Sequence, residues 1–303
     1  MSKKFQISLL CWMTRSLVAC MMCVATGQAA AGPDTHSAAS LRAMYAELGP
    51  KLGNNQFKRP LYLDSAESSS HLKGDIYALV DFPFSVVNEA LNDPAHWCDV
   101  MILHLNTKYC HASTSKAGSV LQVSIGKKYF QPLDDAYPVE FAYNAAIATP
   151  DYFDVLLNAK TGPLGTSDYR ILLEAVSVQG GKTFLHLTYS YAYNFAGLLA
   201  MKSYLATVGS GKVGFTIIGK QSGGQPNYIG GVRGVVERNT MRYYLAIDAY
   251  LGALSAPPSE QLEKRLQSWF TSTEQYPLQL HEVDRAAYLD MKRREYLRDQ
   301  KSP

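Results

Sequence analysis

The sequence predicts an α+β protein in which an antiparallel sheet precedes one long helix and a charged helical tail. Three observations predict this class. Residues 106–193 contain a succession of segments with alternating apolar and polar residues, a pattern typical of strands. Residues 230–254 place apolar side chains along one helical stripe. Residues 259–303 hold eight acidic and eight basic residues at helical spacing, which indicates a solvated helix packed against the rest of the chain.

The first 31 residues have the pattern of a secretory signal. Basic residues precede the apolar run SLVACMMCVA, and three consecutive alanines after it offer small side chains for cleavage. We therefore expect an exported, periplasmic protein whose mature chain begins near residue 32. Two alternatives stay open, namely a signal anchor that is never cut and a lipid anchor on Cys20, because LVAC resembles a lipoprotein box.

Removing this segment changes the charge of the chain. Three of the 29 basic residues and none of the 26 acidic residues lie in it, so 26 of each sign remain. A balanced charge provides no general field for attracting nucleic acid, so we expect no nucleic-acid partner. No later apolar run reaches the ~18 residues that a membrane span requires.

Helices and strands alternate in the first part of the mature chain. Leu41, Met44, Tyr45 and Leu48 recur at helical spacing before the stop Gly49-Pro50, which predicts a helix over 37–52. Two strands joined by a serine-rich turn are expected next, at 59–65 and 72–81, followed by short helices at 83–93 and 94–103.

The middle of the chain predicts a run of antiparallel strands. They are expected at 119–128, 139–148, 152–159, 167–178 and 182–194. Gly180-Gly181 is a compact hairpin signal between the last two strands. In the final strand Leu187 and Tyr189 share one face while His186 and Thr188 share the other. A short helix at 196–207 and a further strand at 212–219 should follow.

The helix at 230–254 is the strongest helical signal of the sequence. Its apolar stripe runs through Val236, Thr240, Tyr243, Ile247, Leu251 and Leu254. Pro257-Pro258 ends it. The tail beyond is expected to pack through Leu262, Leu266, Trp269, Tyr288 and Tyr296. The chain thus divides into a signal peptide (1–31), one large domain (32–256) and a charged helical extension (257–303).

This order of elements resembles the helix-grip fold of the START and birch-pollen-allergen-like superfamily (SRPBCC-like). The stretch DFPFSVVNEALNDPAHWCDV is similar to the strand and helix that open that fold, and the amphipathic helix at 230–254 is similar to its last helix. The segments GFTIIGK and RGVVERNTMRYYLAI resemble an exported bacterial branch. The resemblance covers about residues 37–254. It implies a curved antiparallel sheet wrapped around a long C-terminal helix, with an apolar cavity between them.

The resemblance also implies a function. Members of the superfamily bind lipids, sterols or other hydrophobic small molecules, so we expect a periplasmic binding or carrier protein that has transient membrane contact. Two other functions stay open, an enzyme of the cyclase or hydrolase type that uses the same cavity and a non-catalytic structural protein of the envelope. Nothing matches the iron motifs of the ring-hydroxylating oxygenases of the superfamily, so no cofactor is expected.

Cys98 and Cys110 are the only cysteines beyond the signal segment, with eleven residues between them. An exported protein meets an oxidising compartment, which favours a disulfide. Zinc is the alternative, because His96, His104 and His111 lie nearby, but this spacing does not fit the paired ligands of zinc motifs. A nucleophilic cysteine would need a free thiol of lowered pKa. We therefore predict a disulfide, no metal site and histidines without a special role.

Candidate ligand-binding residues are those that could line the cavity. A tyrosine offers a large apolar ring with a hydroxyl at its tip, which suits an amphipathic ligand. The predicted lining consists of Tyr143, Tyr189, Tyr191, Tyr243, Ile247 and Arg170. The tyrosines could instead simply fill the core, and Arg170, like Arg238 and Arg242, could instead form ion pairs. No pair of titratable residues stands out, so no catalytic residue is predicted.

Overall fold

The computed structural model describes residues 36–299, so the predicted signal segment lies outside the described residues. One antiparallel sheet has the order β1-β2-β8-β7-β6-β5-β4-β3. Its strands are β1 (Leu61–Glu67), β2 (His71–Val80), β3 (Thr107–Ser115), β4 (Gly118–Ile125), β5 (Tyr137–Ala148), β6 (Tyr152–Thr161), β7 (Thr166–Val178) and β8 (Lys182–Tyr193). Strand β2, near the start of the chain, pairs with β8, the last strand of this sheet along the chain.

One helix precedes the strands of the sheet, two lie between β2 and β3, and the others follow β8. The helices are α1 (Ala38–Gly53), α2 (Phe84–Leu91), α3 (Pro94–Met101), α4 (Phe195–Ala206), α5 (Gly231–Ala253), α6 (Pro258–Thr273), α7 (Pro277–Leu280) and α8 (Arg285–Asp299). Short 3-10 turns occur at Leu133–Asp135 (η1) and Pro163–Gly165 (η2). The predicted α+β class and nearly all predicted elements are therefore confirmed, with shifts of one to three residues at most ends.

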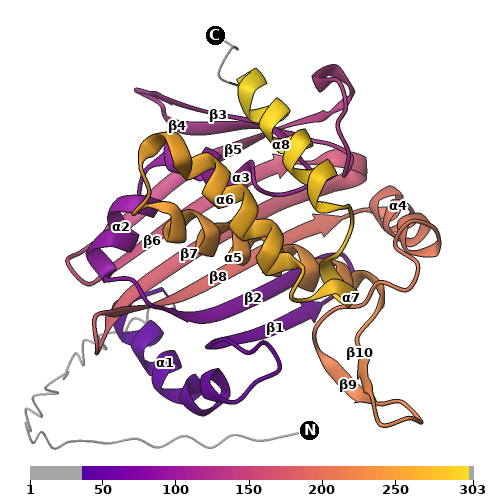
Figure 1. Cartoon of the computed structure of the whole chain (residues 1–303), viewed down its shortest axis with the longest axis horizontal. Helices are drawn as coiled ribbons and strands as arrows, with labels where there is room; N and C mark the ends of the chain where they lie inside the picture. The colour runs from indigo at the N-terminus through magenta and orange to yellow at the C-terminus, as the bar shows by residue number, and fades with distance from the viewer. Residues whose placement is uncertain (1–35, 300–303) are drawn as a thin grey trace, which may run out of the picture. The chain divides into compact units, whose positions relative to one another are not determined.

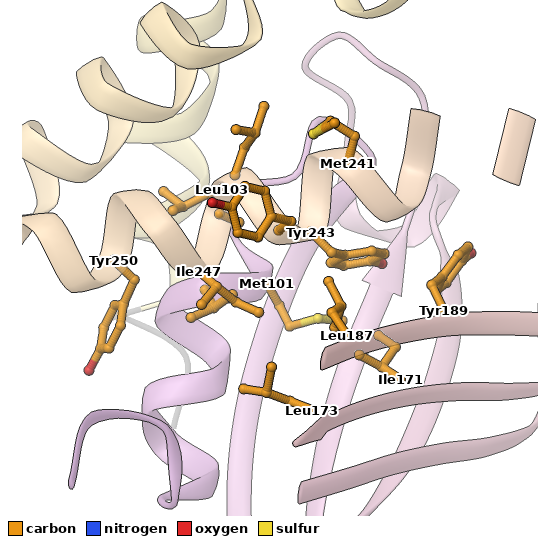
Figure 2. Packing of buried hydrophobic residues seen from close by; sticks show 14 of the residues in the cluster. Met101, Leu103, Ile171, Leu173, Leu187, Tyr189, Met241, Tyr243, Ile247 and Tyr250 are labelled. Carbon is orange, nitrogen blue, oxygen red and sulfur yellow. The ribbon is translucent and has the colours of Figure 1, made fainter. Parts of the chain in front are cut away.

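The long helix α5 packs along one face of the sheet, which we call the inner face. It contacts β1, β2 and β8 there. Figure 2 shows Tyr243 and Ile247 of α5 in one packed layer with Leu187 and Tyr189 of β8. Alternation along β8 places His186 on the opposite, outer face. The sheet and its long helix thus form the arrangement that the sequence predicts.

The prediction of a single apolar stripe on α5 was too narrow. Side chains around almost its whole circumference are buried, including the charged Glu237, Arg238 and Arg242. The reason is a second layer: α6 packs on α5, and α8 packs on α6 and β3 (Figure 1). The helix therefore lies between the sheet and the tail.

The tail is less solvated than its charge suggested. Of the predicted contacts, Leu266, Trp269 and Tyr288 are buried, and the indole N–H of Trp269 donates to the Arg242 carbonyl on α5 (3.1 Å). Lys292 and Glu295 of α8 are also fully buried. Lys292 Nζ bonds Glu295 Oε2 at 2.7 Å and the Thr107 carbonyl at 2.6 Å, so the tail is fastened to β3 by buried polar groups.

The predicted strand at 212–219 is mostly wrong. Only Ile217–Lys220 forms a strand (β9), and it pairs with β10 (Pro226–Tyr228) in a separate two-stranded hairpin. The preceding residues are held instead by α5, because Glu237 accepts hydrogen bonds from the backbone N–H groups of Phe215 (2.5 Å) and Thr216 (2.9 Å). These backbone donors are thereby unavailable to a sheet.

Cys98 of α3 and Cys110 of β3 form the predicted disulfide, with their Cα atoms 5.2 Å apart. The bond closes the loop between α3 and β3. Inside it, Ile102, Leu103, His104 and Leu105 are all buried. Within residues 36–299, no helix combines the length and apolar character needed to cross a bilayer.

Candidate functional site: a cavity between the sheet and the long helix

A cavity of about 120 Å³ lies between the inner face of the sheet and α5, and we call it the inner cavity. Strands β5, β7 and β8, the helix α5 and the loop after α3 all contribute to its wall. The lining residues are His104, Asn106, Ile125, Val139, Phe141, Pro163, Tyr169, Tyr189, Asn239 and Tyr243. The core fills the remainder of the interface between sheet and helix, so this cavity is a small local opening in a packed layer.

A second space of about 270 Å³ adjoins the inner cavity, and we call it the outer pocket. The two share Pro163, Tyr169, Tyr189 and Asn239. Helix α4 and the turn η2 cover the outer pocket, which is lined in addition by Leu164, Thr166, Tyr191, Gly197, Ala200, Met201 and Tyr204. Tyr169 stacks on Tyr191 (ring centroids 5.3 Å apart) and forms part of the boundary between the spaces.

His104 is the most unusual residue of the wall. Its Nδ1 accepts the backbone N–H of Asn106 (3.2 Å), and its ring stacks on Tyr243 at 5.0 Å. Burial lowers the pKa of His104 well below its usual value, and the nearby cation of Arg242 lowers it further. The ring is therefore neutral, and its proton is on Nε2. This Nε2–H is buried and has no hydrogen-bond acceptor in the described part of the chain.

The other polar groups of the wall are also arranged to donate. Asn239 donates its amide to the Tyr189 oxygen, and burial keeps the pKa of Tyr189 far above its usual value. Tyr204 accepts a hydrogen bond from Lys128 Nζ at 2.8 Å. Because the oxygen of each tyrosine already accepts, its O–H proton is left for another partner. The wall therefore offers donors where a ligand would need to supply acceptors.

Cations lie directly behind this wall. Arg242 donates to Asn239 Oδ1 (3.2 Å) and pairs with Glu282 (2.8 Å), while Lys128 pairs with the same carboxylate (2.7 Å). Burial opposes ionisation of Glu282, but Arg242 and Lys128 hold its pKa below the usual value. One carboxylate is therefore shared by two cations at the back of the cavity. The predicted ion pairing of Arg242 with a tail carboxylate is observed here.

The structure brings three of the six predicted lining residues together. Tyr189 and Tyr243 border the inner cavity, and Tyr191 borders the outer pocket. Ile247 is buried one helical turn beyond Tyr243, outside either lining. Tyr143 is half-buried on β5 and also lies outside both, with a buried hydroxyl that has no partner among the described residues.

The prediction that Arg170 lines the cavity is wrong. Its neighbours in β7, Tyr169 and Ile171, face the core, so Arg170 lies on the outer face, where it is exposed. Its register partners Asn158 and Ser190 lie on that same face. A charged residue next to a tyrosine in sequence is on the opposite side of a strand, and this alternation would have excluded it.

Sequence reasoning missed His104, Tyr169, Asn239 and Tyr204. His104 was treated as a bystander because its spacing to the cysteines did not fit a metal motif. The signal that could have found it is its place inside a disulfide-closed loop whose neighbours Leu103 and Leu105 are apolar. Asn239 could have been found from the helix, since it is followed one turn later by Tyr243.

A second polar cluster lies on the outer face, near α1. His186 bonds Glu174 through Nδ1 (2.8 Å) and Asp75 through Nε2 (2.9 Å), and its ring stacks on Tyr77 at 4.2 Å. Thr188 donates to Asp75 (2.6 Å). Burial opposes the charged imidazole, yet the hydrogen bonds to Asp75 and Glu174 raise the pKa of His186. Every charge in this cluster has an opposite partner.

The residues 36–299 contain no group of three or more His, Cys, Asp or Glu side chains placed to hold a metal ion. The inner cavity offers a hydrogen-bond donor and a largely apolar wall. A neutral histidine, tyrosine hydroxyls and a ring-lined wall can orient a small molecule that has both an apolar body and an acceptor. A neutral imidazole beside a tyrosine can also transfer a proton.

Comparisons with known proteins give weak likenesses in structure. The chain is similar to truncated norcoclaurine synthase from Thalictrum flavum (12% identity, 48% of this chain and 89% of that chain, TM-score 0.33). It is also similar to the Zhui aromatase/cyclase from Streptomyces sp. R1128 (11%, 71% and 95%, TM-score 0.30) and to human StAR-related lipid transfer protein 5 (8%, 56% and 91%, TM-score 0.30). No protein-family model and no curated protein matches the sequence.

The order and pairing of the chain's own elements define the fold. Strand β2 is followed by two short helices and then by six consecutive antiparallel strands, the last of which returns to pair with β2. After α4 and the β9–β10 hairpin comes the long helix α5, which packs on the inner face. A curved antiparallel sheet around a long helix that follows its last strand is the helix-grip fold, as the sequence predicts.

Proposed function

We propose that this protein binds and carries a small amphipathic molecule in the inner cavity and the outer pocket, in the periplasm. The observation that supports the proposal most directly is the buried Nε2–H of His104, which borders the cavity and has no acceptor among residues 36–299. An unpaired buried donor costs about 1–3 kcal/mol, and a ligand that places an acceptor in the cavity beside His104 would remove this cost.

The volume of the cavity narrows the class of ligand. A cavity of about 120 Å³ is close in size to one that holds a single benzene ring, and most small-molecule sites are larger, at ~300–1,000 Å³. A single ring or a short chain therefore fits the inner cavity, and the remainder of the ligand would lie in the outer pocket. A sterol-like ligand or a lipid with two chains would require α4 to move outward.

Helix α4 is suited to such a movement and to transient membrane contact. Among its twelve residues only Gly197 is buried, while Phe195 is 81% exposed and Leu199 is 55% exposed. Leu164 of η2, which lies beside α4 at the outer pocket, is also exposed. An apolar surface at the entrance of an apolar pocket would let a ligand pass from a bilayer without crossing water.

A second function, proton transfer in a cyclase-type reaction, is favoured by one observation. The wall is not purely apolar, because neutral His104 stacks on Tyr243 at the cavity. A general acid–base residue must reach the proton that it moves, and His104 could reach only a ligand within this cavity. Both functions begin with the same complex of protein and ligand. They differ in whether the bound molecule is recovered unchanged.

The test compares two substitutions that differ in one hydrogen-bonding position. His104→Gln keeps a donor near the position of Nε2, whereas His104→Asn keeps only a group near Nδ1 that can accept from Asn106. Native mass spectrometry of protein purified from the periplasm should show a co-purified small molecule in the wild type. The amount bound should be retained in His104→Gln and fall about tenfold in His104→Asn.

Three outcomes would decide the matter. Equal loss in both variants, with unchanged stability, would contradict the role of the Nε2 donor. A wild-type protein that carries no small molecule and binds no fluorescent fatty-acid or sterol probe would contradict carriage. Conversion of a bound molecule into a product that the His104→Asn variant does not form would establish the enzymatic function instead.

A further inference from the structure

Positive charge accumulates around Glu282 beyond what this carboxylate can neutralise. Arg242 and Lys128 both pair with Glu282. Burial raises the pKa of Glu282, these two cations lower it, and Lys212 lies close enough to lower it as well. Lys212 itself donates to the His281 carbonyl next to Glu282 in sequence. Three cations therefore face one carboxylate in a largely buried region.

Arg238 adds a fourth cation to this group. Its side chain is among the largest fully buried ones (1% exposed), and no carboxylate lies within ion-pair distance of it among residues 36–299. Its Nη1 donates to the Val213 carbonyl at 3.2 Å, and its guanidinium is within hydrogen-bonding reach of Tyr204. Burial lowers the pKa of Arg238, and the neighbouring Arg242 lowers it further.

The neighbouring acid on the same helix does not compensate Arg238. Glu237 accepts hydrogen bonds from the hydroxyls of Ser65 (2.5 Å) and Thr216 (2.6 Å) and from two backbone N–H groups. Its acceptor capacity is taken up there, on the side of α5 toward β1. Among the described residues Arg238 therefore forms no ion pair, and it shares the longer-range attraction of Glu282 with the cations that already pair with that carboxylate. Such an excess of buried positive charge is costly unless another group supplies counter-charge.

This unbalanced charge lies directly against the outer pocket. Tyr204 and Asn239 line that pocket, and each accepts a hydrogen bond from one of the cations behind it, Lys128 and Arg242 respectively. Tyr191, also in the lining, is close enough to Arg238 for the positive charge to oppose the burial that raises its pKa. The remaining lining is apolar, with Met201, Ala200 and Leu164.

We infer that the ligand is an anionic amphiphile, a molecule with an apolar body and one carboxylate or phosphate head group that lies against Tyr204 and Asn239, in front of the buried Arg238. The inference rests on the proposed function, since it names the chemistry of the molecule that the same site would carry. Its apolar body would occupy the outer pocket and the tyrosine-lined inner cavity. A charge-assisted hydrogen bond to the head group would complete the donors that the protein leaves unsatisfied.

The first experiment uses four probes on the full mature wild-type protein. Isothermal titration would measure the dissociation constants of decanoate, decyl phosphate, decanol and inorganic phosphate. Decanoate and decanol differ mainly in the charge of the head group, so their ratio reports charge recognition. We expect decanoate or decyl phosphate to bind at least about tenfold more tightly than decanol, and inorganic phosphate to bind far more weakly than either.

The second experiment locates the charge recognition with matched arginine substitutions on α5. Arg238→Met should remove most of the preference for decanoate over decanol. Arg233→Met is the control, because Arg233 donates to Ser65 on the other side of the helix, at 2.8 Å. It should keep the wild-type preference. If Arg238→Met does not fold, Tyr204→Phe removes one wall hydroxyl from a half-buried ring and should reduce the preference in the same direction.

The possible outcomes distinguish failure of this inference from failure of the proposed function. Equal affinity for decanoate and decanol in the wild type would overturn the inference and leave the proposed function standing. Inorganic phosphate that binds as tightly as decyl phosphate would overturn it in favour of a free-anion site. Absence of binding by all four probes would contradict the proposed function for this class of ligand, and the inference with it.

Discussion

The two faces of the sheet hold buried polar groups in opposite states. On the outer face, His186 lies between Asp75 and Glu174, and each of these groups has a partner of opposite charge. On the inner face, within the part of the chain that the structure describes, the donor of His104 has no acceptor and Arg238 forms no ion pair. Strands of the same sheet carry both sets of groups. We interpret the paired cluster around His186 as stabilising the fold, and the groups around His104 and Arg238 as the place where a ligand would bind.

The comparison can be broken most sharply by removing the centre of the paired cluster. His186→Ala removes the imidazole that bridges Asp75 and Glu174 and leaves only the more exposed Lys73 and His36 as basic partners, so we expect the free energy of unfolding to fall by about 3 kcal/mol, the lower end for a broken buried pair. Urea unfolding followed by circular dichroism measures it. His111→Ala, at an exposed position of β3, is the control and should change stability by less than about 0.5 kcal/mol. A loss below about 1 kcal/mol for His186→Ala would show that the cluster is not structural.

The disulfide comes next in size. Replacing Cys98 and Cys110 by serine opens a short loop, which in the chain-entropy model lowers the free energy of unfolding by about 2–3 kcal/mol. The loop carries His104, so ligand affinity should fall as well. Urea midpoints and ligand titration of the wild type and the double variant test both effects. Unchanged affinity despite lost stability would separate the loop from the site.

The smallest expected effect is the pH dependence, and it has opposite signs on the two faces. The pKa of His186 is raised in the folded protein, so its stabilisation is complete below pH 6.5 and is lost as the pH rises through the raised value. The pKa values of Asp75 and Glu174 are lowered by their hydrogen bonds to His186 despite burial, so their contribution is lost as the pH falls through those lowered values. The pKa of His104 is lowered, so the unfolded chain takes up a proton there first and stability falls below pH 6.5.

The measurement is the free energy of unfolding at pH 5.5, 6.5, 7.5 and 8.5 for the wild type and His186→Gln. The difference between the two should shrink as the pH rises above 6.5. Asp299 also titrates in this range, because burial raises its pKa to about 7, but its contribution is common to both proteins and cancels. A difference that stays constant over the whole range would show that His186 is not charged in the folded protein.

Much of the fold follows from local patterns in the sequence. Alternation in β8 separates Leu187 and Tyr189 from His186, and the structure confirms that separation. The periodicity of α5 locates the helix, but it cannot reveal that α6 covers the other side, because burial there depends on residues far along the chain. The sequence does not predict that the strand begins only at Ile217, for the same reason. Glu237, which is distant in sequence, accepts a hydrogen bond from the backbone N–H of Phe215, just before that strand.

The site is less predictable than the fold. Tyrosines were sound candidates for a cavity wall, because ring size and hydroxyl chemistry are local properties. The role proposed for His104 rests on the lack of an acceptor near its Nε2–H among the described residues. The role proposed for Arg238 rests on the lack of an ion pair there. Absence of a partner is a property of the assembled structure, and no spacing along the chain records it.

The position of His104 within the disulfide loop has a practical consequence for how the protein matures. A chain folded in a reducing cytosol would keep Cys98 and Cys110 as thiols, and the segment that presents the imidazole would be tethered only by packing. Such a preparation could give a normal circular dichroism spectrum and still lack a competent pocket. Oxidation would then act as the last step of assembly, and the segment that carries His104 would be fixed in place only after the disulfide has closed.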